Sequence, residues 1–590
     1  MDIIKLLQKK VGDWEKSSVQ VTDGLEFNQY QTIRRIEFYT SSRYLTGFQN
    51  RDSRGRIKPF YNITNYRVNI ATRATDLDTK DIQIVADEPK FTPMSFLLQK
   101  EVYNWMKDAN FAKTLNDMGF TRAKYGGVLV KKCVEYNEET KEDELEIEVV
   151  DWRNVITDPI DPDDFVIEKH YMSPEDLAEK IDVWDNVEEA IDIANKSTDN
   201  TVLVYEMTGS FPENAYDGEG SEYVYKIQKF FILKSGKAKH SILYHEFLED
   251  EPYMYLAWEK VPGRGLGRGI VEDGFEAQMW TNDAIVREKE AMELGSKVIF
   301  KTTDPDIQNN VLSEVENGQV IKLKQGNDFS IANTITNALP EFHKQVDSWN
   351  SQYERSSSTY GAISGETMPS NTPYRSVAIL NQEATSMFDY RREEMGIWLT
   401  EMFTNWIIPY LLKKLSKGHI LRAEFTAEEL KAIDDSYANY VANEEVTKKI
   451  LAGSPVYAED YPMYVNAIKE DLKKTKSHRF LDIPKGIYKD FTAKVTIVTT
   501  GEQKNKAVVL ETLNNLLITV AKAPQILQDP KLSVIFAKIL ETSGSGISPI
   551  TLGLGTETMV QPQPIQPAEG VQPVQSTTPE PVTASQANQQ

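Results

Sequence analysis

Cysteine, histidine and long apolar runs are scarce in this sequence, and each shortage excludes a class of protein. The single cysteine, Cys133, excludes an internal disulfide framework and a zinc site built from several cysteines. The six histidines lack the spacing of metal ligands: a zinc-binding helix beginning at His245 would need a second histidine at 249, which is a glutamate. No apolar run approaches the roughly 20 residues that span a bilayer. We therefore expect no metal, no cofactor and no membrane segment.

The beginning of the sequence also lacks a targeting signal. Residues 1–14 have apolar side chains at helical spacing, but they contain no continuous apolar core and no small-residue cleavage site. We expect the protein to act in a cytoplasm, or in a particle that is assembled there.

Motifs for catalysis are missing as well. The glycine cluster at 263–269 lacks the GK[ST] ending of a nucleotide-binding loop, and no G-x-S-x-G nucleophile elbow occurs. Nine acids lie between 135 and 151 against one lysine, but they follow a strand-like alternation and its turn, so most should point to solvent. The aspartates of the proline-broken loop 156–164 are typical of turns. We expect that the protein is not an enzyme.

Basic residues are outnumbered, with 66 lysines and arginines against 89 acids and a net charge of -23. This charge argues against a protein that wraps DNA in phosphate contacts, while a conduit for DNA and a merely soluble surface both fit it. Basic residues do cluster at 34–73 and 469–479, and each cluster is either a phosphate contact or a solvated, subunit-contacting surface. The candidate DNA contacts in the second cluster are Lys473, Lys474, Lys476 and Arg479.

Periodicity predicts a mainly helical α+β protein. Four helices are expected before residue 130, the last one stopped by Gly126 and Gly127. A period of two then predicts a hairpin over 128–151, and a capping box at Ser173 predicts a short helix. The four helices are expected at 28–44, 62–75, 92–107 and 111–125, and three further strands at 201–207, 222–233 and 240–247.

The middle of the chain alternates long helices with short elements. The glycine turn 263–269 leads into a helix at 270–292, and a flexible Gly/Ser/Thr/Pro segment at 361–373 precedes a very long helix at 374–415, which Pro409 should kink. Between them we expect strands at 297–301, 319–324 and 329–332, a small helix at 307–316 and a helix at 340–360.

The C-terminal part of the sequence again favours helices. Thr426 and Glu429 form a capping-box pattern, and 493–500 alternates as a strand. From about residue 555 the chain is rich in Gln, Pro and Thr and contains no Lys or Arg, so we expect this end to be disordered.

The order of these elements resembles that of bacteriophage portal proteins, the head-to-tail connectors, and several segments look like their hallmarks. TRAKYGGVLVK at 121–131 resembles a glycine-stopped helix leading into a strand, and DWRNVITDP at 151–159 a strand-to-loop segment. GRGLGRGIVEDGFEAQMWTNDAIVREKEAM at 263–292 is similar to the glycine turn and first stem helix of the family. Residues 501–549 resemble C-terminal helical sequence of portals from short-tailed phages.

The resemblance implies a portal fold with the following parts. They are a wing at 1–262, the glycine turn and first stem helix at 263–293, a small α/β clip at 294–338, the second stem helix at 339–360, a tunnel loop at 361–373, a long wing helix at 374–420, a helical crown at 421–554 and a disordered tail at 555–590.

The resemblance also implies a function. The chain would be one of probably twelve copies in a homo-oligomeric ring at one capsid vertex, through which double-stranded DNA is packaged and ejected. Its partners would be the terminase large subunit, which hydrolyses the ATP, then a head–tail adaptor, the major capsid protein, and scaffold or internal proteins. The residues expected to face the DNA are Glu272, Asp273, Glu276, Asp283, Glu290 and Glu293 in the stem, and Gly365, Glu366, Thr367 and Met368 in the tunnel loop.

Two other readings stay open at this point. One is a different structural protein of the virion, such as a head–tail adaptor or tail-tube component, although adaptors are generally much shorter. The other is a nucleic-acid enzyme such as a terminase or nuclease, which the missing GK[ST] loop disfavours.

Overall fold

The fold is known from a computed structural model of the chain, in which two compact units are distinguished. One unit comprises 1–425 and 433–508, and the other comprises 426–432 and 509–590. The described residues lie almost wholly in the first unit. They are 2–14, 16, 18–45, 50–51, 55–79, 82–86, 92–137, 142–216, 220–235, 239–295, 299–303, 325–326, 328–332, 339–360, 374–416, 419–422, 427–452, 460–474, 480–483 and 493–497.

The N-terminal third begins with helices, as predicted, and their ends have local causes. The side chain of Asn28 accepts a hydrogen bond from the Gln31 amide and caps α2, while Gly126 adopts a φ of 93° and ends α5. A first helix and a small hairpin precede them. The elements are α1 (Ile3–Trp14), β1 (Val19–Thr22), β2 (Leu25–Phe27), α2 (Gln29–Thr40), α3 (Thr64–Ala74), α4 (Thr92–Asp108) and α5 (Phe111–Tyr125).

Two antiparallel sheets follow. The predicted hairpin is confirmed as β4 (Gly127–Asn137) and β5 (Glu142–Val149), and β11 (Tyr253–Ala257) pairs with the free side of β4. The second sheet has the order β10-β9-β8-β7-β6. Its strands are β6 (Val155–Thr157), β7 (Phe165–Met172), β8 (Val202–Pro212), β9 (Tyr225–Ser235) and β10 (Lys239–Phe247).

Helices cover both faces of the five-stranded sheet. Ile3 and Leu7 of α1 pack on one face together with Ile167 and Phe230. On the other face lie α6 (Pro174–Ala178) and α7 (Val187–Lys196). Ser173 and Asp176 form the predicted capping box at the start of α6. Because both faces of the sheet are covered, its strands show little alternation between buried and exposed side chains.

A larger core joins the N-terminal helices to the three-stranded sheet. It contains side chains from α2, α3, α5 and β4, together with Trp152 and Trp258. Residues of the glycine turn and of the helices after it, among them Leu266, Ile270 and Tyr353, belong to the same core. The glycine turn is therefore part of the protein interior.

The long helices of the middle region are confirmed, with two interruptions. The helix predicted at 270–292 is divided at Gly274 into α8 (Ile270–Asp273) and α9 (Phe275–Gly295). The helix predicted at 374–415 consists of α12 (Tyr374–Met402), a π-helical turn (Phe403–Ile407) and α13 (Ile408–Ser416). The wider turn directly precedes Pro409, where the missing amide and the ring disturb the regular hydrogen bonding.

The remaining elements pair distant segments. The predicted strand at 493–500 is β16 (Ala493–Ile497), and it pairs with β3 (Ile82–Ala86) of the N-terminal region. The sequence did not predict β3, and it placed β16 with the crown. The other elements are β12 (Ile299–Thr302), β13 (Phe329–Ala332), α10 (Leu339–Ser357), β14 (His419–Arg422), α14 (Ala427–Leu451), α15 (Tyr461–Lys474), β15 (Phe480–Ile483) and the short 3-10 helix Glu213–Ala215. The α+β class is confirmed.

Candidate functional site: a glycine-anchored helical hairpin

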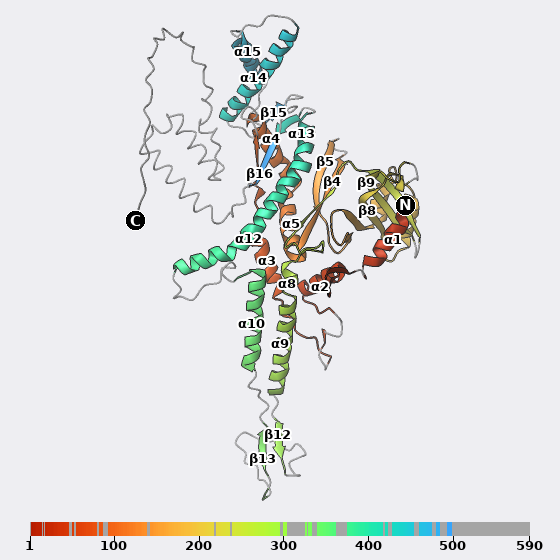
Figure 1. Cartoon of the computed structure of the whole chain (residues 1–590), viewed down its shortest axis with the longest axis vertical. Helices are drawn as coiled ribbons and strands as arrows, with labels where there is room; N and C mark the ends of the chain where they lie inside the picture. Colours follow the sequence, from red (N-terminus) through yellow and green to blue (C-terminus); the bar gives the residue numbers. More distant parts are fainter. Residues whose placement is uncertain are drawn as a thin grey trace, which may run out of the picture. The chain divides into compact units, whose positions relative to one another are not determined.

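The helices α9 and α10 form a hairpin that begins at the glycine turn and at α8 (Figure 1). Trp280 of α9 stacks on Trp349 of α10 with ring centroids 6.3 Å apart, and His343 Nε2 lies 3.0 Å from a carboxylate oxygen of Glu288. These contacts hold the two helices side by side. Four of the six stem acids that the sequence analysis expects to face DNA lie on α9, and the other two, Glu272 and Asp273, lie on α8 directly before it.

Backbone packs directly on backbone at the base of this hairpin. A Cβ atom on Gly267 would lie 2.3 Å from the carbonyl oxygen of Gly126, and a Cβ on Gly269 would lie 2.5 Å from the Gly126 nitrogen. The Trp258 amide also donates to the Gly126 oxygen at 2.8 Å. The glycines of the turn thus allow a close approach to the end of α5, which a side chain would prevent.

Arg264 is buried in the turn, where its side chain binds protein groups. Its guanidinium forms two hydrogen bonds to the Glu272 carboxylate, at 2.8 and 2.7 Å, and donates to the carbonyl oxygens of Leu266 and Gly267. It also lies 4.0 Å from the centre of the Phe27 ring. Both partners of the ion pair are largely shielded, so this arginine is not available to a phosphate in this conformation.

The division between α8 and α9 is filled by an aromatic ring from α10. A Cβ on Gly274 would lie 2.2 Å from the Tyr353 ring, and the Tyr353 hydroxyl donates to the Ile270 carbonyl at 2.8 Å. Burial strongly raises the pKa of this hydroxyl, so it stays protonated. Tyr353 therefore fixes the start of one hairpin helix against the end of the other.

Asp273 lies at the same junction, and the pKa of its carboxyl is raised. Burial raises the pKa of its carboxyl to about 7, although Arg268 lies 3.8 Å away and opposes the shift. Glu259 and Glu272 add to the rise by repulsion. The base of the hairpin consequently contains an acid that exchanges its proton near neutral pH.

The predicted channel acids are distributed over three environments. Glu272 and Asp273 are turned toward arginines of the same chain, as described above. Asp283 is 2.8 Å from Arg287 one turn further along α9, and Glu293 binds Arg56 through both oxygens at 2.7 and 2.8 Å. Glu276 and Glu290 are exposed. Trp280 Nε1 donates to the Glu276 carboxylate at 3.3 Å. That these acids face DNA stays a prediction.

Most of the other predicted DNA contacts lie in parts of the chain that the structure does not describe. Gly365, Glu366, Thr367, Met368, Lys476 and Arg479 lie outside the described residues. Lys473 and Lys474 end α15, and only their backbone is described. Most of the predicted clip and all of 555–590, the tail that the sequence analysis expects to be disordered, are likewise outside the described residues.

The far part of the hairpin has no interior of its own. None of the residues 285–293 of α9 or 339–352 of α10 is buried. Met292 is 50% exposed and Trp280, nearer the base, 41% exposed. Two helices with so little shared core are not self-sufficient, and helices of this kind usually pack on further helices.

A buried group of charges lies between the two sheets, and sequence reasoning missed it. Glu168, His170 and Glu206 present ligand atoms within 4.8 Å of one another, a set that suits a divalent cation. The Lys131 amine, however, is 2.9 Å from Glu168 and 2.5 Å from Glu206, and it takes the place of the cation. Against the effect of burial, the hydrogen bond from His170 and the charge of Lys131 lower the pKa of Glu206 to about 2. The signal in the sequence that could have revealed this group is Lys131, because a lysine two residues after the apolar Leu129 lies on the same face of the strand.

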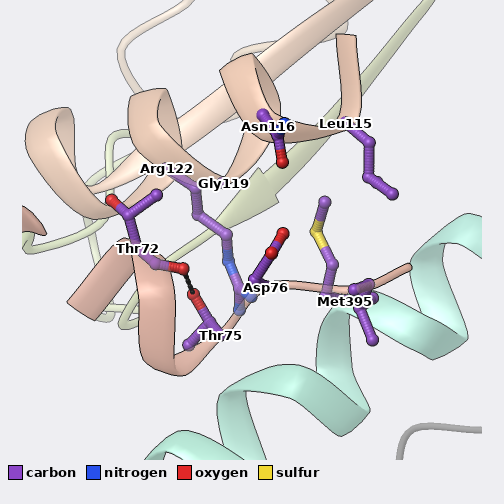
Figure 2. Close-up of a pocket in the computed structure, with 9 residues that line it drawn as sticks. Thr72, Thr75, Asp76, Leu115, Asn116, Gly119, Arg122 and Met395 are labelled. Carbon is purple, nitrogen blue, oxygen red and sulfur yellow. Dashed lines mark hydrogen bonds between the residues drawn. The ribbon is translucent and has the colours of Figure 1, made fainter. Parts of the chain in front are cut away.

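A small cavity between α3, α5 and α12 is too small to hold a substrate. Figure 2 shows Thr72 of α3 and Thr75 directly after it, Asn116 and Arg122 of α5 and Met395 of α12 around the cavity. Its volume of about 10 Å³ accommodates one water molecule, whereas ligand pockets measure hundreds of Å³. Arg122 is instead a structural group: it donates to the carbonyl oxygens of Ala257 and Arg391 and binds Glu394 at 2.9 Å.

In the part of the chain that the structure describes, every helix is too short or too polar to serve as a membrane span.

No protein-family model and no curated protein sequence matches the chain. Among solved structures, a chain in "Neck of empty GTA particle computed with C6 symmetry" is 9% identical, with a TM-score of 0.35 over 75% of this chain and 97% of that chain. A chain in "Virion of native gene transfer agent (GTA) particle" is 10% identical, with a TM-score of 0.33 over 77% of this chain and 100% of that chain. The chain thus has a distant structural likeness to components of gene transfer agent particles, and at these values the likeness establishes no shared role.

Proposed function

We propose that the chain is a structural subunit of a tailed, phage-like virion, and more specifically a portal protein. In this proposal identical copies form a ring, probably of twelve, at one capsid vertex. The ring surrounds the channel through which double-stranded DNA enters and leaves the particle, and it is assembled in the cytoplasm of the host cell.

One observation carries the proposal. The hairpin α9–α10 is rigidly anchored at its base by the glycine turn and Tyr353, yet its far part buries no residue within the chain. A hairpin that is fixed in direction but lacks a core is suited to pack against its copies. Head-to-tail contacts, which join two different surfaces of identical copies, close a ring when the rotation between copies permits it.

The absence of catalytic motifs in the sequence is consistent with this role. The glycine turn, which was the one phosphate-loop suspect, uses Arg264 for the Glu272 ion pair and its glycines for packing. We propose that the protein has no catalytic activity and that its further partners are proteins: the terminase large subunit, a head–tail adaptor, the major capsid protein, and scaffold or internal proteins.

Negative-stain electron microscopy of the purified full-length chain, with mass photometry alongside, tests the proposal. We expect rings with a central channel wide enough for a DNA duplex and a mass near twelve subunits. A monomer or dimer at every salt and protein concentration would overturn the proposal and return attention to an adaptor or an enzyme, for which an ATPase assay is the first check.

The DNA contact is tested separately within the ring. Glu276→Lys with Glu290→Lys reverses the two exposed acids of α9 and should impair DNA passage in a packaging assay while rings still form. Arg287→Glu with Lys289→Glu, also on α9, is a control of equal size and opposite sign. Unchanged packaging by the first variant would contradict the idea that these acids face the DNA.

A further inference from the structure

We propose that the described residues of the arginine-rich segment 34–58, which begins in α2 and runs toward α3, form a docking surface for an acidic surface of a second copy of this chain. The inference rests on the proposed ring and deepens it, because it assigns one side of the contact between neighbouring subunits.

The charge of this segment is opposite to that of the rest of the chain. Residues 34–58 contain seven lysines and arginines and two acids, a net charge of +5. Since the whole chain has a net charge of -23, the remaining residues have a net charge of -28. Copies of such a chain repel one another overall, so a close contact between them requires a local meeting of opposite charges.

Arg56 of the segment pairs with Glu293, but four other cations have no carboxylate partner among the described residues. Arg34, Arg43 and Arg51 are exposed, and no described carboxylate forms an ion pair with them or with Lys58. In the rest of the described chain, arginines are mostly paired with acids. Those pairs include Arg67 with Glu354, Arg122 with Glu394, Arg264 with Glu272, and Arg392 with Asp389.

Exposed apolar and aromatic side chains accompany these cations. Ile57 is 73% exposed, Tyr61 54% and Tyr66 46%. Protein–protein interfaces are enriched in arginine and aromatic residues and depleted in lysine, and the fully buried centre of an interface is more apolar than the rest of the surface. A surface that only follows a phosphate backbone has no use for an exposed isoleucine, so the composition favours a protein partner over nucleic acid.

Arg56 of the segment and the residues that follow the segment, Tyr61 and Ile63, contact the hairpin that the proposed function uses. Asn282 of α9 accepts from the Tyr61 amide at 2.9 Å, Gln278 accepts from the Ile63 amide at 3.0 Å, and Arg56 binds Glu293 near the end of α9. A neighbouring copy that covers the coreless part of the hairpin would therefore also meet these cations.

Charge reversal of the full-length chain tests the inference. Arg43→Glu with Arg51→Glu changes the net charge by -4 at two exposed residues. The control, Lys9→Glu with Lys196→Glu, makes the same change at two exposed lysines of α1 and α7. Thermal melting should show that all three proteins are equally folded. Mass photometry should then show assembly at least about tenfold weaker for the first variant, while the control assembles like wild type.

Three outcomes overturn the inference. If both variants assemble equally, the segment is not at the contact. If the first variant keeps its rings but loses binding of a labelled DNA duplex that wild type binds, the surface is a nucleic-acid site. If wild type itself never assembles, the proposed function fails together with the inference, which distinguishes this result from the first two.

Cross-linking identifies the acidic side of the contact. Arg43→Lys with Arg51→Lys places amines in the segment, and a carbodiimide joins amines to carboxylates without a spacer. Rings made from equal amounts of ¹⁴N- and ¹⁵N-labelled protein should yield peptides in which residue 43, 51 or 58 is joined to an acid of the other label. Rings that yield only same-label peptides from these residues would overturn the inference.

Discussion

The two ends of the hairpin α9–α10 differ in how tightly they are packed. At its base, glycines, a buried tyrosine and a buried arginine leave no space for a further atom. In its far part no residue is buried, and the contacts are ion pairs and one stacked pair of tryptophans. The base therefore stabilises the monomer, while the far part contributes to stability only when something packs against it.

The largest effect is expected from adding a methyl group at the tightly packed base of the hairpin. Gly267→Ala places a Cβ 2.3 Å from the Gly126 oxygen, where backbone meets backbone and neither side can move cheaply. We expect a loss of at least about 4 kcal/mol in the free energy of unfolding, or failure to fold. Gly12→Ala, in α1 with nothing within 4 Å, should instead raise stability by about 0.5–1 kcal/mol. Urea denaturation measures both, and a mild effect of the first substitution would refute the close packing.

Arg264 supplies the second test. Arg264→Met leaves the Glu272 carboxylate shielded without its counterion and removes the donors to Leu266 and Gly267. We expect a loss of about 3–5 kcal/mol. The double variant with Glu272→Gln should recover part of this loss, because the unpaired charge is gone. If the double variant is less stable than Arg264→Met, the unpaired Glu272 carboxylate is not the cause of the stability loss in Arg264→Met.

A pH titration tests the junction at Asp273. The pKa of this carboxyl is about 7 in the folded chain against 3.8 as the ordinary value, so the folded state holds the proton more tightly. Its stabilising contribution is full below about pH 4 and is lost as pH rises through 7. Asp273→Asn should therefore be more stable than wild type by about 4 kcal/mol at pH 8 and similar in stability at pH 4. Parallel pH profiles for the two proteins would contradict the shifted pKa.

The smallest effect is expected in the far part of the hairpin. Arg56→Gln and Glu293→Gln remove a pair in which both side chains are partly exposed, so a double-mutant cycle on the monomer should give less than about 1 kcal/mol. The same cycle measured on assembled rings should give a larger coupling, because a neighbouring copy would shield the pair from water. Equal couplings in monomer and ring would mean that this part of the hairpin stays exposed after assembly.

Much of the local structure was predictable because local signals determine it. Gly126 ends α5, Ser173 and Asp176 begin α6, and the alternation after Val128 forms the hairpin β4–β5. The interruption at Gly274 was not predictable, since nothing near that glycine in sequence indicates the ring of Tyr353. The pairing of β3 with β16 joins residues more than 400 positions apart and has no local signal either.

For the candidate site, the sequence identified the right segment but not the ion pairing, pKa or exposure of its acidic side chains. It predicted a tight glycine turn before a long helix, and that prediction is confirmed. It treated six acids as equivalent, whereas Glu272 pairs with a buried arginine, Asp273 has a raised pKa and Glu290 is exposed. Burial sets these differences, and burial depends on neighbours supplied by other parts of the chain.

The sequence by itself determined which segments become helices and strands, the acidic net charge and the local excess of arginine at 34–58, because these depend on residue type and short-range spacing. Only the tertiary structure decided that Arg264 of the glycine turn is buried against Glu272, while Arg34, Arg43 and Arg51 are exposed and form no ion pair with a described carboxylate. The physical reason is that a charge is satisfied by whatever group folding brings within a few ångströms, and that group is usually distant in sequence.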